Sequence, residues 1–323
     1  MTTTWPFIAD FEDISSYARV SVIDALDNGI MFVREDGMFY PKRYVYRSDI
    51  NTNAIVAMLI PNTTDPVQLD LAKGSITIFK NIKGVMVFRQ GDIEFRTNDN
   101  SAIIQQNTET SVANNITVVD GDEVTLTISD LNVESNTSPI TVNNGVSLTL
   151  NLLGSNTLTA TRGGAGISVP AGAALTIQGN GIVTAIGGDN CAGIGGSYGD
   201  SGSITISGGK VSATGGSGAA GIGGGYNGCG GTVRIENAVV TAIGDYHAIG
   251  GGSLDNVNGC ESIIIRNSKM TTSHQEYDYG VTAPWKAGDL DLEGGGGQLE
   301  PVFSWGTLCA SGLIDNLGTA EIR

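Results

Sequence analysis

Charge, proline and cysteine are all scarce in this chain of 323 residues. Charged residues make up 15% of it, where about 25% is typical. There are only 8 prolines, and the 47 glycines follow no triplet period, which excludes a collagen helix. The 4 cysteines form no C-x-x-C motif and there are only 2 histidines, so neither a disulfide scaffold nor a zinc finger is expected. The glycine excess instead favours a repetitive, tightly wound chain.

Positive charge is the scarcer sign, with 17 basic residues against 33 acidic ones and a formal net charge of −16. Nucleic-acid binders carry a basic stripe, and anionic membranes attract polybasic segments. Neither feature occurs here. The longest aliphatic run, AIVAMLI at 54–60, is too short to cross a bilayer. We therefore expect no nucleic-acid partner and no membrane insertion.

The N-terminal sequence MTTTWPFIADFEDISS has no cationic stretch followed by an apolar core. It therefore does not resemble a Sec signal peptide. We expect synthesis in the cytosol, with any passage to the outside following another route.

Residues 1–110 have an ordinary mixed composition and carry most of the aromatic residues. Their short β-branched runs, such as SITIFKNIKGVMVF, predict a small, mostly-β N-terminal module. Aromatic residues without charge are typical of interface cores. The candidates for contacts with other subunits are Phe39, Tyr40, Tyr44 and Tyr46. The alternative is that these rings fill the core of the module itself.

From about residue 112 the sequence repeats, and three columns of apolar residues advance together. The first column is Ile116, Ile140, Ile167, Ile194, Ile222 and Ile249. The second is Leu126, Leu148, Leu175, Ile204, Val233 and Ile263. The third is Leu131, Leu158, Val183, Val211, Val240 and Met270. A fixed period in this range is the signature of a repeat architecture.

Residues alternate around the columns, as in LTI, ITI and VRI in the second and VTA and VSA in the third. Alternation with a period of two is typical of strands with one buried face. Three short strands per repeat predict an all-β fold, a short parallel β-helix of about six coils over residues 111–282. Residues 283–323 break the pattern and are predicted to form a C-terminal cap, because an open last coil would recruit other chains.

The blocks LTIQGNGIVTAIGGDNCAGIGG and ITISGGKVSATGGSGAAGIGGG resemble the Gly-rich β-helical repeats of large bacterial surface proteins. More broadly, the chain resembles the right-handed, pectate-lyase-like parallel β-helix superfamily, which includes phage tailspikes. The resemblance implies a right-handed coil and, by analogy with tailspikes, a homo-oligomer, with a trimer favoured. It implies little about activity, because this fold hosts lyases, hydrolases, adhesins and inert spacers.

A polysaccharide-cleaving enzyme of this class needs carboxylates at a defined separation on one outward ladder. Hydroxyls dominate the outward ladders predicted here. The second column gives Thr149, Thr176, Thr205, Arg234 and Ile264, and the third gives Thr159, Thr184, Ser212, Thr241 and Thr271. Asp189 and Asp245 occupy similar corners and are interpreted as solvated turn positions. No catalytic residue is assigned, and an enzyme is not favoured.

One corner offers a candidate binding surface. Tyr198 and Tyr226 each lie four residues after an isoleucine of the first column, so we expect the two rings on neighbouring coils. Aromatic faces beside polar groups suit a sugar ligand. The candidate glycan-binding residues are Tyr198, Tyr226, Asp200, Asn227, Tyr246 and His247. The alternative is a stack of tyrosines that only covers the turn.

No cofactor or resident metal is expected. Structural calcium is conceivable at the acidic turn that holds Asp120, Asp122 and Glu123, but an ordinary acidic turn between strands is the favoured interpretation. Cys229 and Cys260 belong to matching NGC triplets, and stacked coils would bring them within reach of a disulfide. Buried thiols are the favoured state.

A docking module joined to an acidic, capped β-helix suits an attachment protein. The leading hypothesis is a non-enzymatic spike, fibre or decoration protein of a virus or phage particle, found in the virion or outside the cell. Its expected partners are other virion subunits and a host-surface glycan. The alternatives are a polysaccharide lyase or glycoside hydrolase of the β-helix class, and a bacterial surface adhesin.

Overall fold

The computed structural model describes residues 66–81, 84–97, 99–121, 123–245, 247–252 and 260–274, together with the backbone of three short strands after residue 289. The chain divides into two compact units, residues 1–65 with 92–96, and residues 66–91 with 97–323. Phe39, Tyr40, Tyr44 and Tyr46 lie outside the described residues, and their interface role stays a prediction. Strand β4 (Ile93–Thr97) lies almost wholly in the first unit.

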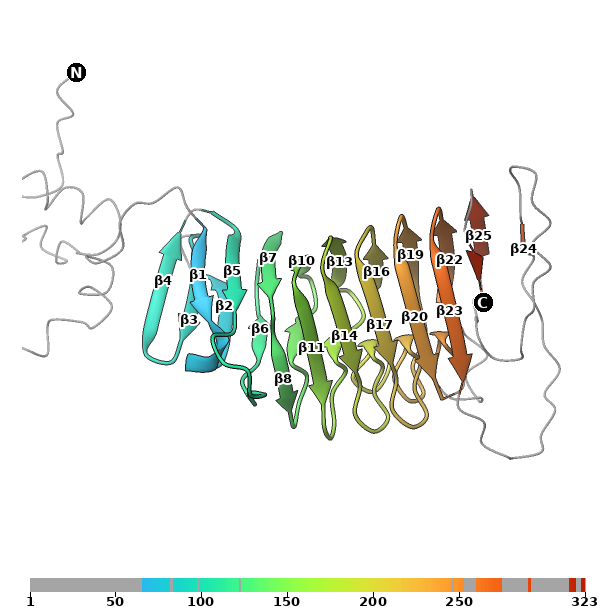
Figure 1. The fold of residues 1–323 in the computed structure, drawn as a ribbon, viewed down its shortest axis with the longest axis horizontal. Helices are drawn as coiled ribbons and strands as arrows, with labels where there is room; N and C mark the ends of the chain where they lie inside the picture. Colours follow the sequence, from blue (N-terminus) through green and yellow to red (C-terminus); the bar gives the residue numbers. More distant parts are fainter. Residues whose placement is uncertain are drawn as a thin grey trace, which may run out of the picture. The chain divides into compact units, whose positions relative to one another are not determined.

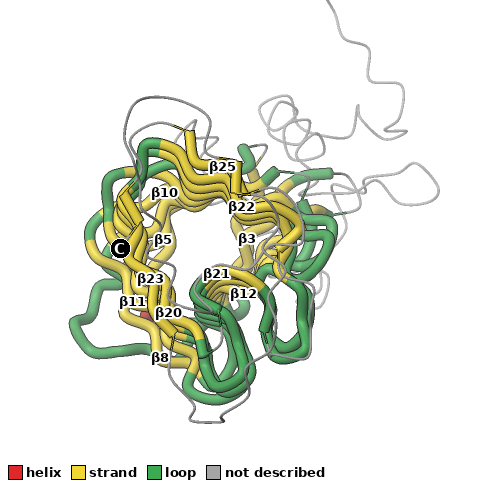
Figure 2. Tube along the Cα trace, turned by 90° about the vertical axis from the view of Figure 1, so that its right-hand side faces the viewer, coloured by secondary structure: helices red, strands yellow, loops and turns green. Residues whose placement is uncertain are grey.

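The second unit is a stack of coils whose strands form three sheets (Figure 1). Viewed along the stack, the strands of successive coils superpose and the loops project from the corners (Figure 2). In sheet order, sheet A contains β1 (Val67–Asp70), β5 (Ser101–Gln105), β7 (Val124–Ser129), β10 (Ser147–Leu153), β13 (Ala174–Gly179), β16 (Ser203–Ile206), β19 (Gly230–Glu236), β22 (Cys260–Arg266), β25 (Ile314–Leu317) and β24 (Leu290–Asp291). Sheet B contains β21 (Ile249–Gly250), β18 (Ile222–Gly223), β15 (Ile194–Gly195), β12 (Ile167–Ser168), β9 (Ile140–Val142), β6 (Ile116–Val118), β2 (Ile76–Lys80) and β3 (Met86–Gln90). Sheet C contains β26 (Glu321–Ile322), β23 (Lys269–His274), β20 (Val239–Gly244), β17 (Lys210–Thr214), β14 (Ile182–Ile186), β11 (Ser155–Ala160) and β8 (Asn132–Ser135).

Six complete coils run from β6 to β23, and each contributes one strand to sheets B, A and C in turn. Neighbouring coils pair in parallel throughout these six. The helical content of the described residues is the 3-10 turn η2 (Leu71–Lys73). The predicted all-β fold, a right-handed parallel β-helix of about six coils, is confirmed.

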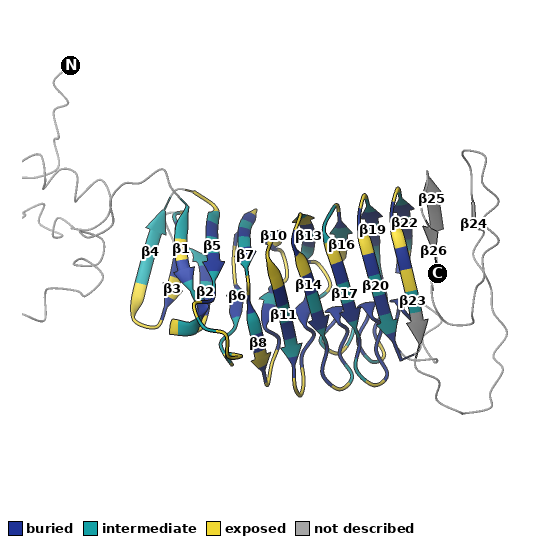
Figure 3. Cartoon of the chain, in the orientation of Figure 1, coloured by how far each residue is buried: buried dark blue, intermediate teal, exposed yellow. Residues whose placement is uncertain are grey.

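The isoleucine column is confirmed residue by residue. Each member pairs directly with the next, from Ile116 with Ile140 to Ile222 with Ile249. All six side chains are fully buried, and buried positions alternate with more exposed ones along the longer strands (Figure 3). This stack is the centre of the hydrophobic core.

The second column is correct from the second coil onward, where Leu148 pairs with Leu175, and the third column is correct from the third coil onward. The pairings before those points are wrong by one pleat. Leu148 pairs with Val124, not with Leu126. Val183 pairs with Asn156, not with Leu158, so the outward ladder of sheet C contains Thr157 where Thr159 was predicted. Strands of this length have more than one inward position, so an apolar pattern of period two does not fix which pleat aligns.

Asn156 is the reason the third column was misread, because it puts an amide in the core. Its side chain is fully buried. The amide oxygen accepts a hydrogen bond from the Leu131 N–H at 3.1 Å, and the amide nitrogen donates to the carbonyls of Leu153 and Ile182 at 2.9 and 3.1 Å. It therefore links three consecutive coils, and its polar groups are satisfied.

The corner between sheets A and C is tight in every coil. Each of these six turns contains a residue with left-handed φ, a conformation that glycine, asparagine and aspartate tolerate best. The residues are Asp130, Gly154, Gly179, Gly209, Asn237 and Asn267. The Gly, Asn and Asp punctuation of the sequence is thus explained by backbone geometry.

The sheets continue on both sides of the six coils. β1 and β5 pair in parallel at the start of sheet A, and β2 extends sheet B and forms an antiparallel hairpin with β3. β25 pairs in parallel with β22, and β26 with β23. Residues 67–105 therefore contribute strands to the β-helix. The domain divisions at 110 and 282, and the cap over 283–323, stay predictions.

Candidate functional site

Tyr198 and Tyr226 lie side by side in the loops that connect sheet B to sheet A on consecutive coils. Their ring centroids are 5.8 Å apart and the ring planes meet at 44°. Tyr198 is 64% exposed, and Tyr226 is half-buried. This is the tilted arrangement of an aromatic pair, with one face left to solvent. We call it the tyrosine pair.

The backbone that carries Tyr198 is strained. Its φ is +90°, a value that residues with a side chain rarely adopt. Such outliers persist only where the surroundings impose them, and they gather at functional sites. Here the loop is held by hydrogen bonds between coils: Gly225 N–H donates to Gly199 O, and Tyr226 N–H donates to Asn190 O, each at 2.9 Å.

Glycines let the two tyrosine loops lie directly on each other. A Cβ on Gly225 would come within 2.5 Å of the Tyr198 nitrogen, and one on Gly228 would collide with the Gly199 carbonyl. A Cβ on Gly218 would lie 2.6 Å from the edge of the Tyr226 ring. The glycines around the pair are thus required by close backbone approach.

Three serines anchor the first tyrosine loop to earlier coils. Ser197 Oγ donates to Ser168 Oγ at 2.8 Å and lies 3.1 Å from Ser138 Oγ. It also accepts a hydrogen bond from the Ala165 N–H at 2.9 Å. No repeat pattern indicated this row of hydroxyl groups, because the three serines lie at different offsets from the isoleucine column.

The remaining predicted glycan-binding residues divide between surface and interior. Asp200 and Asn227 are exposed, and Asp200 Oδ1 accepts a hydrogen bond from the Cys229 N–H at 2.7 Å. His247 is only 4% exposed, and its Nδ1 lies 2.8 Å from Gly251 O. It therefore does not belong to the exposed surface around the pair. Tyr246 lies outside the described residues.

The interpretation of Asp189 and Asp245 as equivalent solvated positions is wrong for Asp245. Asp189 is exposed, but Asp245 is only 4% exposed. Asp245 lies four residues before the isoleucine of its own coil in the first column. The residues at that position in the two preceding coils are Asn190 and Gly218, not Asp189. Its Oδ2 accepts a hydrogen bond from the Gly218 N–H at 2.6 Å, and Oδ1 has no partner in the part of the chain that the structure describes.

The predicted stacking of Cys229 on Cys260 is wrong by one residue, because Gly230 is the partner of Cys260 in the sheet. Cys191, Cys229 and Cys260 are thiols. Burial raises the pKa of Cys191, against a hydrogen bond from the Gly164 N–H that lowers it. A raised pKa keeps this thiol protonated and unreactive.

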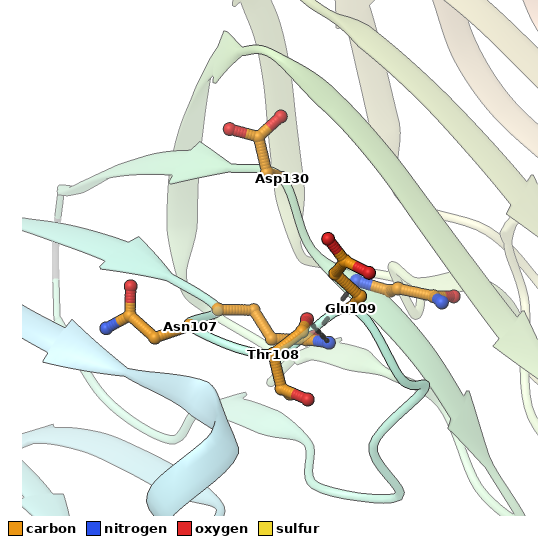
Figure 4. A pocket seen from close by; sticks show the side chains of 6 residues that line it. Asn107, Thr108, Glu109 and Asp130 are labelled. Atoms are coloured by element: carbon orange, nitrogen blue, oxygen red, sulfur yellow. Dashed lines mark hydrogen bonds between the residues drawn. The ribbon is translucent and has the colours of Figure 1, made fainter.

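Apart from the tyrosine pair, a cavity lies at the corner between sheets A and C of the first coils (Figure 4). It is an open cavity of about 390 Å³ lined by Gln106, Asn107, Thr108, Glu109, Asp130 and Asn132. Gln106 is buried and shapes it: its Oε1 accepts from the Asn132 N–H, and its Nε2 donates to the carbonyls of Thr108 and Thr110. No sequence motif indicated this cavity, because its residues come from two coils that do not repeat the later pattern.

Two carboxylates at this cavity, those of Asp130 and Asp70, have a lowered pKa. Hydrogen bonds from the Ser155 N–H and the Ser129 hydroxyl lower the pKa of Asp130. Burial works to raise the pKa of the adjacent Asp70, but hydrogen bonds from Asn107 and Ala72 outweigh it and the pKa is lowered. A general acid needs the opposite shift. Asp130 and Asp70 are thus suited to accept hydrogen bonds rather than to donate a proton.

The outward ladder of sheet A is confirmed for Thr149, Thr176, Thr205, Arg234 and Ile264. Charge enters this face at the last coils, where Glu236 forms ion pairs with Arg234 and Arg266. The negative charge of Glu236 is thus balanced by two arginines on the same face.

In the turn considered for calcium, the Asp120 carboxylate accepts a hydrogen bond from the Gly121 N–H. Asp122 lies outside the described residues. Among the residues that are described, no group of three or more His, Cys, Asp or Glu side chains converges as metal ligands would. Over the same residues, no helix is long and apolar enough to cross a membrane.

Two segments, residues 175–198 and 204–226, match the family model of a beta helix repeat. No curated protein and no solved structure matches the chain. Fold and repeat together define a parallel β-helix repeat protein, and such a fold supports a carbohydrate-related or surface role in general. The first matched segment ends at Tyr198 and the second at Tyr226, so the tyrosine pair occupies the same place in two successive repeats.

Proposed function

We propose that this protein is a non-enzymatic, glycan-facing surface protein, and specifically a spike, fibre or decoration component of a virus or phage particle. The observation that carries the proposal is the tyrosine pair, an exposed aromatic surface built on strained backbone. Other virion subunits and a host-surface glycan are its proposed partners. A homo-oligomer, with a trimer by analogy with tailspikes, is its proposed assembly.

The chemistry of the pair suits a sugar. The CH face of a pyranose ring stacks on an aromatic face, and polar groups at the rim bond its hydroxyls. Tyr198 supplies the open face, and Asp200 and Asn227 supply the exposed polar rim. One stacking ring with two polar side chains at its rim is a suitable composition for a shallow carbohydrate site.

The charges on the described surface support leaving the catalytic role unassigned. The outward ladders of sheets A and C are mostly hydroxyls over the middle coils. Glu236 is paired with arginines, and the pKa of Asp130 is lowered. The cavity lined by Glu109 and Asp130 is nevertheless a concave surface with carboxylates, so cleavage is part of the test.

Binding to immobilised host-surface polysaccharides tests the proposal, with Tyr198→Ala/Tyr226→Ala as the variant. We expect about fivefold weaker binding for each ring lost, because a stacked aromatic contributes roughly 1 kcal/mol. Tyr198→Phe/Tyr226→Phe keeps both rings and is the matched control. No reducing ends or unsaturated sugars should be released from any polymer that binds.

Normal binding by the double alanine variant contradicts the glycan site. Release of sugar fragments contradicts the non-enzymatic assignment, and Glu109→Gln then shows whether the cavity is responsible. Mass spectrometry of purified particles from a producing culture tests the virion assignment, which fails if the protein is found only in the cell lysate.

A further inference from the structure

We infer that the tyrosine pair selects a positively charged sugar, an amine-bearing glycan, over neutral and acidic ones. This inference rests on the proposed function and names the ligand class of the same site. It follows from the carboxylates that surround the pair, one at its rim, one beside its anchor and one beneath it.

Asp200 is the carboxylate at the rim. It follows Tyr198 by two residues, and its Oδ1 is fixed by the Cys229 N–H of the next coil at 2.7 Å. The side chain is exposed, and Oδ2 has no hydrogen-bond partner among the described residues. A carboxylate fixed through one oxygen presents the other to a ligand without further loss of side-chain entropy.

Asp189 is the carboxylate beside the anchor of Tyr226. The neighbouring residue, Asn190, accepts the hydrogen bond from the Tyr226 N–H. Asp189 is exposed, and the described residues provide its side chain with no ion pair. It adds a second negative charge on the Tyr226 side of the pair.

Asp245 is the carboxylate beneath Tyr226. Its Oδ2 is bonded to the Gly218 N–H, and Gly218 is the residue whose open side faces the Tyr226 ring edge. Asp245 is only 4% exposed, and its Oδ1 has no hydrogen-bond partner in the described part of the chain. Charge–charge interactions are screened less in the interior than in water. A cation bound at the pair would offset the charge of this carboxylate.

The basic residue that stacks on this corner is Arg162, whose backbone carbonyl lies against Gly188, next to Asp189. Its side chain is exposed. Among the described residues named here, one arginine does not balance three carboxylates, so their summed charge is negative. Aromatic faces also attract cations directly. A sugar that stacks on Tyr198 thus gains from an amine, gains nothing from an acetamide and is repelled if it carries a carboxylate.

The test compares three oligosaccharides of similar size by isothermal titration calorimetry at low salt: glucosamine oligomers, their N-acetylated counterparts and galacturonate oligomers. We expect the glucosamine oligomer to bind at least about tenfold more tightly than the acetylated one. Its affinity should fall as salt is added, because exposed charges are screened. Galacturonate should bind most weakly.

Asp200→Asn removes the charge but keeps an oxygen for the Cys229 N–H. It should weaken glucosamine binding about threefold, the size of a solvent-exposed ion pair, and leave the acetylated oligomer unaffected. Arg162→Gln is the control of opposite sign and should leave glucosamine binding unchanged or tighter. Tyr198→Ala should weaken both ligands.

Equal affinity for the charged and acetylated oligomers, both lost in Tyr198→Ala, overturns the charge selection and leaves the glycan site intact. Tightest binding of galacturonate overturns it as well. Glucosamine binding that is unchanged in Tyr198→Ala overturns both the inference and the proposed site, because the charge would then act elsewhere on the acidic surface.

Discussion

The two ends of each sheet A strand are built on different rules. At the end that leads to sheet C, every coil turns tightly through a left-handed Gly, Asn or Asp. At the end that comes from sheet B, the loop grows from 143–146 in the second coil to 196–202 and 224–229 in the fourth and fifth. The tight corners repeat because only a few residue types fit them. The longer corners are free to vary, and the tyrosine pair lies there.

The difference teaches where a β-helix can carry function. A corner that keeps the same backbone conformation in each coil accepts few residue types, so its residues cannot vary to suit a ligand. A longer loop must only deliver the next strand in register, and the coil beside it supplies the support. Tyr198 can hold a φ of +90° because the fixed corners and the isoleucine core already determine the positions of both loop ends.

The largest expected effect comes from breaking the repeated part itself. Ile222→Asp would bury an unpaired carboxylate in the isoleucine column, at a cost of several kcal/mol, comparable with the whole stability of a domain. We expect loss of the cooperative urea transition followed by circular dichroism. Thr205→Asp, on the outward ladder, is the control and should unfold near the wild-type midpoint. A stable Ile222→Asp protein would contradict the assigned core.

A smaller effect is expected where the variable loops rest on each other. A Cβ in Gly228→Ala would collide with the Gly199 carbonyl, and the resulting backbone shift should cost about 1–3 kcal/mol and separate the tyrosine rings. Glycan binding should fall more than stability does. Gly199→Ala provides the comparison, since its Cβ would meet no atom within 4 Å and only its positive φ is unfavourable. Equal losses of binding in both variants would contradict the stacking argument.

The smallest effect has the opposite sign. Tyr198→Gly removes a side chain from a backbone conformation that glycine adopts freely, so the free energy of unfolding should rise by up to about 1 kcal/mol while glycan binding falls. Urea titration and calorimetry on the same preparation would show the two changes together. A loss of stability would mean that the ring contributes more by packing on Tyr226 than its backbone costs.

The sequence predicted the positions at which the same residue type recurs in every coil. It did not predict the features that occur in one coil only. The isoleucine column was read correctly because each coil places a single isoleucine between small residues. Tyr198 and Tyr226 were found through that column, being at the same offset from it. Asn156 was missed because an amide in the core depends on three backbone partners from different coils, which no local pattern records.

The same limit applies to the buried charges and the cavity. Asp245 resembled Asp189 in its local sequence, and only the count from Ile249 assigns it to the buried position. Gln106 shapes the cavity through backbone groups of two other segments. Features made by contacts between coils that differ in sequence require the structure.

The unbroken register of the isoleucine column makes the coil a unit that can be copied. Removing or duplicating a segment such as 194–221 would leave every remaining pairing intact and change the height of the stack by about 4.8 Å. Residues on either side of the change would face a coil with the same column pattern. Recombination between repeats can therefore change the length of the coil stack by one coil at a time, while the sequence at either end stays the same.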